Sequence, residues 1–394
     1  MSLLKSYSFS EILLSLLLFF SAFVAKFDEF NVIALYVAIP ISTLICRIYY
    51  KTEDVGNWFR MLTILFIWIM FTGLFADYPS IVQRHFIQIL GVFLLCYIVK
   101  TMSKYDSFIP ILYIMYIVYF IGMFYFIYSR GLLAAFDYTI SRLAEGEGAS
   151  ASINANEPAY FTFFSTVAIF MLGDIISNRS INRILKLLFF ATIPISFGVA
   201  LLTGARQTLI IQIPTILLLL YCRYPLRSQK SQLLIIFLIG IAGYMLPKAL
   251  DVYDNSTLSH RAEKNVNDDV RTRLIKDACR VGMENPIVGV GPGCYIKYSR
   301  EGGFSHCTYT ELFANSGTPA LLIYSMMLLS FVRLQYVRYK RTKDTLFKIF
   351  LIVGLMYVIY NFFYVFYQNL WLMAFFFLIA NHSDTYYRNK YLIQ

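Results

Sequence analysis

The feature that most constrains this chain is a series of apolar runs, each long enough to cross a lipid bilayer, that recurs from one end of the sequence to the other. A membrane-spanning helix needs about 20 mostly apolar residues, whereas the strands of a membrane barrel are shorter and alternate apolar with polar residues. The runs here are continuously apolar, and only 14% of the 394 residues are charged. The sequence therefore predicts an all-α polytopic membrane protein that forms a single integral membrane domain over residues 1–394.

We expect about twelve transmembrane helices, because polar segments divide the apolar sequence into runs of that number. Several neighbouring runs are joined by only a few polar residues, which is typical of antiparallel helical hairpins. The first run is expected to be a spanning helix and not a cleaved signal peptide, since others follow it. The predicted spans are residues 8–25, 31–49, 58–76, 82–99, 108–128, 157–177, 184–203, 206–222, 231–248, 311–332, 346–362 and 365–381.

The distribution of charge predicts the orientation of the chain. When alternate loops are placed on opposite sides, the side with both termini holds 20 Lys and Arg against 7 Asp and Glu, and the other side holds 14 against 16. Cytoplasmic loops of membrane proteins are enriched in Lys and Arg, so both termini are predicted to lie in the cytoplasm. The net charge of +11 follows from this bias. The sequence contains no long basic face with interleaved aromatic residues outside the apolar runs, so a nucleic-acid partner is not expected.

Two loops on the predicted outer side are long: residues 129–157, and residues 249–310 between the ninth and tenth spans. Within the larger loop, residues 270–281 are expected to form an amphipathic helix. Its apolar face would hold Val270, Leu274, Ala278 and Val281, and its basic face Arg273, Lys276 and Arg280.

A glycine-rich stretch follows this helix. Gly289, Gly291 and Gly293 place three glycines within five residues, where the backbone must turn tightly or lie close to another group. An ordinary surface turn is the alternative. Such a stretch is only a weak indicator of phosphate binding, because no strand and helix flank it as they do in a nucleotide fold.

The six cysteines show no CxxC spacing and no neighbouring histidine at the distance of a metal-ligand pair, which argues against a zinc site. We expect no metal and no cofactor. Cys279, Cys294 and Cys307 share the larger loop. If that loop lies on an oxidising side of the membrane, a disulfide among them is an alternative to three free thiols.

The strongest candidate for chemistry is His306, in a stretch that leads from the larger loop into an apolar segment and also carries Glu311. Imidazole titrates near neutrality and so suits base catalysis on a hydroxyl group. The alternative is a polar residue hydrogen-bonded at a helix start. Arg206 interrupts two apolar spans at the outer face, where an arginine snorkels, pairs or faces a cavity. With loop arginines it would make a receptor for a diphosphate.

These pieces, in this order, resemble the bacterial O-antigen ligase and polymerase superfamily. The resemblance is carried by Thr203-Gly204-Ala205-Arg206, by Asn285 to Gly293 and by Ser305 to Gly317, in which His306 and Gly317 have the family's spacing. The stretch Asn154-Ala155-Asn156-Glu157-Pro158 resembles a further feature of repeat-unit polymerases. The resemblance covers roughly residues 150–330 and the layout of about twelve spans.

The resemblance implies a GT-C-like membrane glycosyltransferase that uses an undecaprenyl-diphosphate-linked glycan as donor, without a metal. By position, His306 would be the general base, and Glu311 would orient the imidazole or bind acceptor hydroxyls, unless it only stabilises the helix start. Arg206 and a loop arginine, Arg271 with Arg273 close behind, would hold the donor diphosphate. Gly289, Gly291, Gly293 and Gly317 would shape the loop.

The polymerase and ligase alternatives share this donor and differ in the acceptor, which is another lipid-linked repeat unit or a lipid A core sugar. The Asn-Glu-Pro feature favours the polymerase, with a chain-length regulator protein as a further partner. A protein-directed oligosaccharyltransferase belongs to the same superfamily. A lipid-linked oligosaccharide flippase would be expected to carry ionisable residues inside its spans. A metal-dependent enzyme would rely on Asp28 and Glu29. The expected location is the bacterial inner membrane, in contact with its lipids and with the site on the periplasmic face.

Overall fold

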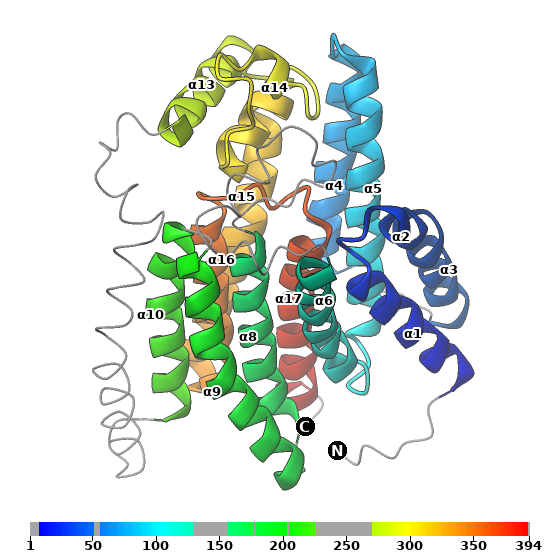
Figure 1. Cartoon of the computed structure of the whole chain (residues 1–394), viewed down its shortest axis with the longest axis vertical. Helices are drawn as coiled ribbons and strands as arrows, with labels where there is room; N and C mark the ends of the chain where they lie inside the picture. Colours follow the sequence, from blue (N-terminus) through cyan, green and yellow to red (C-terminus); the bar gives the residue numbers. More distant parts are fainter. Residues whose placement is uncertain are drawn as a thin grey trace. The chain divides into compact units, whose positions relative to one another are not determined.

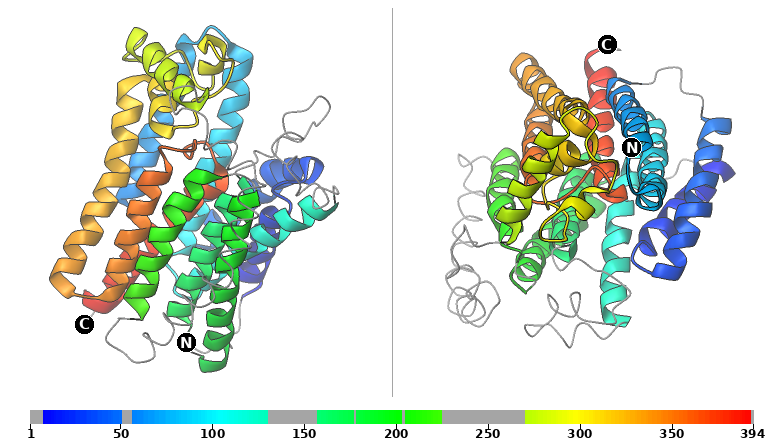
Figure 2. Two further views of the ribbon diagram at one scale, coloured as in Figure 1. Left: turned by 60° about the vertical axis from the view of Figure 1, so that its left-hand side comes forward. Right: turned by 90° about the horizontal axis from the view of Figure 1, so that it is seen from above.

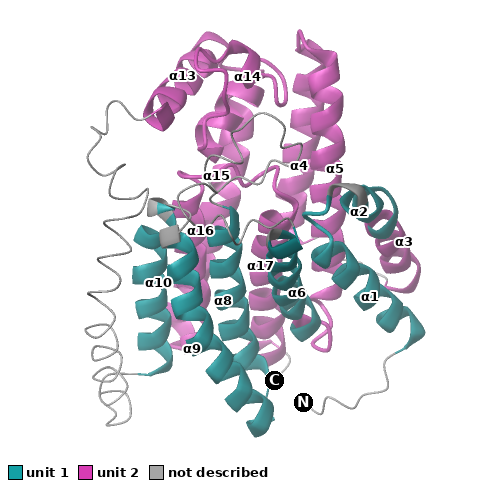
Figure 3. Cartoon of the chain, viewed as in Figure 1, with its two compact units in different colours: residues 1–38, 110–264 teal, residues 39–109, 265–394 magenta. Residues whose placement is uncertain are grey.

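The computed structural model describes residues 8–50, 56–129, 157–176, 178–202, 205–224 and 270–392. Within these ranges all regular secondary structure is helical (Figure 1), which confirms the predicted all-α class. The predicted ninth span, most of the loop at 129–157 and the first part of the loop at 249–310 lie outside the described residues. The chain divides into two compact units, residues 1–38 with 110–264 and residues 39–109 with 265–394 (Figure 3).

The first unit is built around α8, which is buried along almost its whole length and packs on α9. Small residues at the contact, Ala159 on α8 and Ala200 on α9, allow the two helices to approach closely. Gly122 on α6 meets the end of α1, because a Cβ there would lie 2.1 Å from the carbonyl oxygen of Phe23. The elements are α1 (Phe9–Phe23), α2 (Asp28–Ile33), η1 (Ala34–Ala38), α6 (Ile109–Ser129), α8 (Glu157–Ile175), α9 (Arg179–Leu202) and α10 (Arg206–Arg223).

The second unit contains the stretch around His306. In it α15 packs on α4, α13 and α16, while α17 packs on α5. The elements are α3 (Ile39–Tyr49), α4 (Asn57–Thr72), η2 (Gly73–Phe75), α5 (Pro79–Met102), α13 (Val270–Glu284), α14 (Tyr295–Tyr298), α15 (Thr308–Thr342), α16 (Thr345–Tyr360) and α17 (Leu370–Tyr391).

The loops of the second unit gather at its two opposite ends (Figures 1 and 2). At one end, here called the His306 end, the Tyr298 hydroxyl donates to Asp77 between η2 and α5, and Thr308 N donates to Asn361 O at 2.8 Å. At the other, here called the C-terminal end, Thr385 Oγ1 donates to Ser103 O at 2.9 Å. The two groups of loops are those that the charge pattern assigns to opposite sides of the membrane.

Seven described helical segments are long and apolar enough to cross a membrane, and three more apolar helices are shorter. Apolar side chains also line their outer surfaces. On α15, for example, Leu322, Met326 and Leu329 repeat at helical spacing and are each more than half exposed, as expected of a surface that contacts lipid. The seven segments are Phe30–Tyr49, Asn57–Phe75, Pro79–Met102, Ile109–Phe126, Glu157–Ile175, Arg179–Ala200 and Thr308–Thr342. A helical, membrane-embedded protein follows, and the number of about twelve spans stays a prediction.

Candidate functional site

The amphipathic helix predicted in the larger loop is α13, and three of its four predicted core residues are buried. Leu274, Ala278 and Val281 face inward, whereas Val270 at the first turn is 47% exposed. The inner face packs in a small apolar cluster with Tyr295 of α14, Ala314 of α15 and Val82 of α5. The Tyr295 hydroxyl donates to Leu274 O at 2.8 Å, and burial raises the pKa of this phenol to about 12. This contact fixes α14 beneath α13.

The helix α15, which follows His306, is broken at Gly317. Its backbone there has φ 74° and ψ −176°. The backbone carbonyls of the preceding turn therefore lack the N–H donors that the next turn of a continuous helix would provide. Neighbouring groups replace them: Val290 N donates to Ala314 O and Gly291 N to Asn315 O, both at 2.9 Å. Trp68 Nε1 donates to Ser316 O at 2.8 Å. The break is therefore closed by hydrogen bonds and serves as a docking point for the glycine stretch.

The glycine stretch lies against the protein itself. Gly289, Gly291 and Gly293 all have positive φ. A Cβ at Gly289 would lie 2.4 Å from the carbonyl carbon of Asn315, one at Gly291 would lie 2.3 Å from Ala76 Cβ, and one at Gly293 would lie 3.0 Å from His85 Nδ1. The N–H groups of Val290 and Gly291 donate to α15. The stretch thus acts as a close-packed structural turn, and these two amides are not available to a phosphate.

His306 occupies a tight turn just before α15. It has a left-handed backbone, φ 56°, which is uncommon for a residue with a side chain. The residues on either side of it are buried, while His306 itself is half-buried. Ser305 Oγ donates to Cys307 O at 2.9 Å across the turn. The imidazole packs on the Phe304 ring with centroids 4.3 Å apart. These contacts hold the turn around the half-buried His306.

Glu311 lies one turn into α15 and is 4% exposed. Its Oε2 accepts a hydrogen bond from Ser305 N at 2.6 Å, and its Oε1 accepts one from Asn315 Nδ2 at 3.2 Å. Asn315 Oδ1 in turn accepts from Tyr295 N at 2.8 Å. The Glu311 carboxylate therefore binds the backbone next to His306 and connects it to α14.

Beyond Asn315 lie two residues that the sequence did not point to: Tyr367, which the Asn315 side chain contacts, and His85, which contacts Tyr367. Asn315 Nδ2 lies 3.4 Å from the hydroxyl of Tyr367, and that hydroxyl lies 3.4 Å from His85 Nε2 on α5. Only the spacing of Asn315, four residues after Glu311 on one helix face, could have indicated a pair. Tyr367 and His85 are brought in by the tertiary fold.

The two candidate loop arginines begin α13. Arg273 forms a two-point ion pair with Glu301, in which Nε and Oε1 are 2.7 Å apart and Nη2 and Oε2 are 3.3 Å apart. The hydrogen bonds from Arg273 lower the pKa of the Glu301 carboxyl. Arg271 is half-buried. Arg206 is the first residue of α10 and belongs to the first unit. Its side chain lies outside the described residues.

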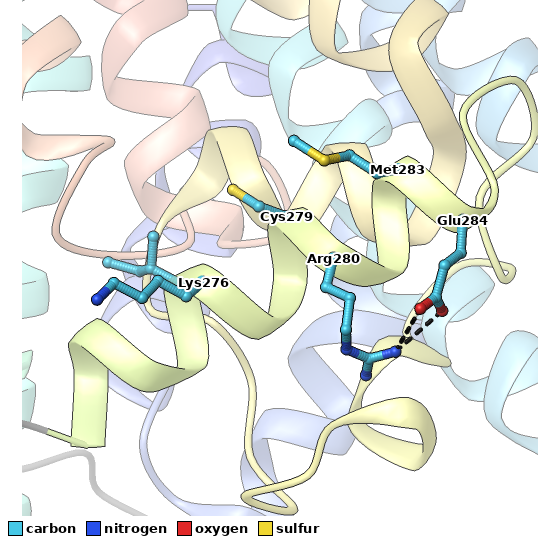
Figure 4. Close-up of a pocket in the computed structure, with 6 residues that line it drawn as sticks. Lys276, Cys279, Arg280, Met283 and Glu284 are labelled. Carbon is cyan, nitrogen blue, oxygen red and sulfur yellow. Dashed lines mark hydrogen bonds and ion pairs between the residues drawn. The ribbon is translucent and has the colours of Figure 1, made fainter.

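Farther along α13, a shallow surface hollow of about 460 Å³ is lined by residues of this helix alone (Figure 4). Arg280 at its edge forms an ion pair with Glu284 at 2.8 Å and also donates from Nε to Asp277 at 2.9 Å. The buried Asp277 accepts a further bond from Arg300 N at 2.8 Å, so it ties the loop before His306 to α13. Lys276, Cys279 and Met283 extend along the other side of the hollow.

The three loop cysteines are unpaired in this structure. Burial raises the pKa of the Cys294 thiol to about 11 and raises that of Cys279 as well. Within the described ranges no three His, Cys, Asp or Glu side chains are grouped as metal ligands. The Asp28 and Glu29 side chains and residues 154–156 lie outside those ranges, whereas Glu157 is buried and pairs with Lys26.

Comparison with known proteins finds no protein-family model that matches this chain and no curated protein that is similar to it.

Proposed function

We propose that this protein is a membrane glycosyltransferase of the O-antigen polymerase type, with His306 as its general base. The donor would be a glycan repeat unit linked to undecaprenyl diphosphate, and the acceptor a hydroxyl of another lipid-linked unit. The fold would be GT-C-like with about twelve spans, in the bacterial inner membrane. Both termini would be cytoplasmic.

The observation that carries this proposal is the setting of His306. A partly accessible imidazole stands on a rigid turn with a left-handed backbone, at the end of the second unit that the charge pattern places outside the cytoplasm. Backbone conformations of this kind cluster at functional sites. The alternative is that His306 is only a polar residue hydrogen-bonded at the start of α15, whose N-cap is the next residue, Cys307; the His306→Asn variant separates the two.

The proposed reaction needs one base and charge stabilisation. The acceptor oxygen would attack the anomeric carbon while the bond from that carbon to the phosphate oxygen breaks. The hydroxyl proton would pass to His306. Undecaprenyl diphosphate would leave with its negative charge held by guanidinium groups, Arg206, Arg271 and Arg273 being the candidates. A diphosphate leaves without a proton, so no carboxylic acid is needed, unlike in glycosidases.

For Arg273, one of the two candidate loop arginines, the structure gives a partner. Its guanidinium already holds Glu301 with two hydrogen bonds, and binding a diphosphate would require that pair to open. The resemblance points to Arg271 first, with Arg273 close behind, and both stay candidates for the loop contribution.

The test is the surface polysaccharide of the native strain carrying His306→Asn or Arg206→Ala, separated on a gel beside wild type. Asparagine tolerates the left-handed conformation better than alanine does, so His306→Asn removes the base and spares the turn. Arg300→Ala, a loop arginine whose side chain is 75% exposed, serves as the matched control. We expect both test variants to lose long chains at normal protein levels and the control to retain them.

The same gel separates the alternatives. Lipid A core with a single repeat unit would identify a polymerase, because ligation survives. Bare core, with long chains still on the lipid carrier, would identify a ligase. An unchanged ladder in His306→Asn would remove the catalytic role of His306 and favour a lipid-linked oligosaccharide flippase.

A further inference from the structure

Three segments of the second unit meet at the side chain of Asn315. Tyr295 N comes from α14, Ser305 N from the His306 turn by way of Glu311, and the Tyr367 hydroxyl from the segment between α16 and α17. Asn315 and Ser305 are fully buried and Glu311 nearly so. Polar groups in such a place must find partners inside the protein.

Two backbone amides set the direction of the hydrogen bonds among Asn315, Glu311 and Ser305. Tyr295 N–H can only donate, so the oxygen of Asn315 must face it and the NH₂ group must face Glu311. Ser305 N–H also can only donate. Both oxygens of Glu311 are therefore used as acceptors, which a carboxyl group allows and a side-chain amide, with one oxygen and one NH₂ group, does not.

We propose that Glu311 and Asn315 are positioning residues, a polar clamp that holds the His306 turn through Ser305 N and takes no part in proton transfer. A carboxylate that accepts from two fixed donors is committed to them. The clamp acts at Ser305 on one side of His306, and the bond from Thr308 N to Asn361 O secures the other side. The inference rests on the proposed function only where it concerns catalysis.

The polarity of the clamp provides a test by exchange. In Glu311→Gln the new NH₂ group faces a donor, either Ser305 N or Asn315 Nδ2. In Asn315→Asp two carboxylates face each other. Each single change therefore breaks the clamp. The double variant Glu311→Gln/Asn315→Asp restores it in reverse. The new amide oxygen accepts from Ser305 N, its NH₂ donates to the new carboxylate at position 315, and that carboxylate still accepts from Tyr295 N.

The measurement is hydrogen–deuterium exchange of the purified full-length protein, followed in peptides that cover residues 299–310. We expect exchange in each single variant to rise about tenfold, the effect of losing one buried charge-assisted hydrogen bond. The double variant should return close to wild type. Glu284→Gln makes the same chemical change at an exposed position of α13 and should leave these peptides unchanged. Exchange in the double variant equal to or above that of the single variants would overturn the clamp.

Polysaccharide synthesis gives the second readout. We expect the single variants to lose it and the double variant to recover it. A double variant that is protected from exchange yet inactive would show that the Glu311 carboxylate acts in the chemistry, which would overturn the positioning role. If the single variants do not accumulate in the membrane, accumulation of the double variant is the rescue, and its absence beside normal Glu284→Gln overturns the proposal.

The two proposals fail separately. If His306→Asn leaves the polysaccharide unchanged, the proposed glycosyltransferase function fails, while the exchange result still decides whether the clamp exists.

Discussion

Gly317 shows how one residue can determine the local shape of this protein. Its φ of 74° and ψ of −176° lie in a region that essentially only glycine adopts. A Cβ at this position would lie 2.0 Å from the carbonyl oxygen of Ile287. Glycine is thus needed both for the break in α15 and for the close approach of the segment that precedes the glycine stretch.

We expect Gly317→Ala to lower the free energy of unfolding by at least about 3 kcal/mol, since backbone strain and a steric clash add. Gly302→Ala is the matched control. Gly302 also has positive φ, but a Cβ there meets nothing within 4 Å, so only the strain remains, about 1 kcal/mol. Thermal unfolding in detergent measures both. Equal losses in the two variants would mean that the contact with Ile287 contributes nothing.

Residues with a distinctive type or spacing could be predicted from the sequence, whereas those whose role is defined by the fold could not. His306, Gly317 and the three glycines of the loop stand out in the sequence. Tyr367 does not, because its partner Asn315 is 52 residues away. The pairing of Arg273 with Glu301 was equally hidden, since loop conformation decides which of several acidic residues reaches an arginine.

At the scale of elements, Asp344 joins α16 to the end of α17. It lies in the short connection between α15 and α16, and its Oδ1 caps α16 by accepting from Leu346 N at 2.9 Å. Its Oδ2 accepts from Lys390 Nζ at 2.8 Å and from the hydroxyls of Tyr386 and Tyr391. Burial raises the pKa of this carboxyl, but the hydrogen bonds together outweigh burial and hold the pKa below its ordinary value.

This shift predicts a dependence of stability on pH. Because the folded-state pKa lies below the unfolded value of about 3.9, ionised Asp344 stabilises the fold above that pH and ceases to do so as pH falls through the folded pKa. We expect Asp344→Asn to reduce stability by about 1 kcal/mol at neutral pH. Its melting temperature should also fall less steeply than that of wild type between about pH 5 and pH 3.

Asp106→Asn is the control for this experiment, because Asp106 is an exposed carboxylate whose partner among the described residues is the neutral Asn389 amide. If Asp106→Asn changed the melting temperature as much as Asp344→Asn does, both at neutral pH and between about pH 5 and pH 3, the Asp344 contacts would not stabilise the helix junction.

Element boundaries were less predictable than the elements themselves. The tenth predicted span, residues 311–332, lies inside α15, which runs from Thr308 to Thr342. The extra residues are polar and basic, so hydropathy could not include them. Near its C-terminal end the helix contacts α17 through side chains, where Arg338 pairs with Asp384 at 2.7 Å. Tertiary contacts of this kind leave no periodic signal in the sequence.

At the scale of the whole molecule, the prediction that matters most is the orientation in the membrane. The donor is expected on the periplasmic side, so the proposed site must face that side and not the cytoplasm. Two cysteines provide natural reporters. Cys279 on α13 and Cys222 near the end of α10 are half-buried, while the other four are buried. The charge pattern places Cys279 outside the cytoplasm and Cys222 inside.

We expect a membrane-impermeant maleimide to label spheroplasts through Cys279. The label should be largely lost in Cys279→Ser, be retained in Cys222→Ser, and return in Cys279→Ser once the membrane is permeabilised.

Burial, with a smaller contribution from the nearby Cys307, raises the pKa of the Cys279 thiol. The reactive thiolate is therefore scarcer at neutral pH, and labelling should accelerate as pH rises from about 7 to about 9. The opposite pattern, with Cys222 labelled from outside, would invert the membrane topology and place His306 in the cytoplasm, where the proposed reaction could not occur.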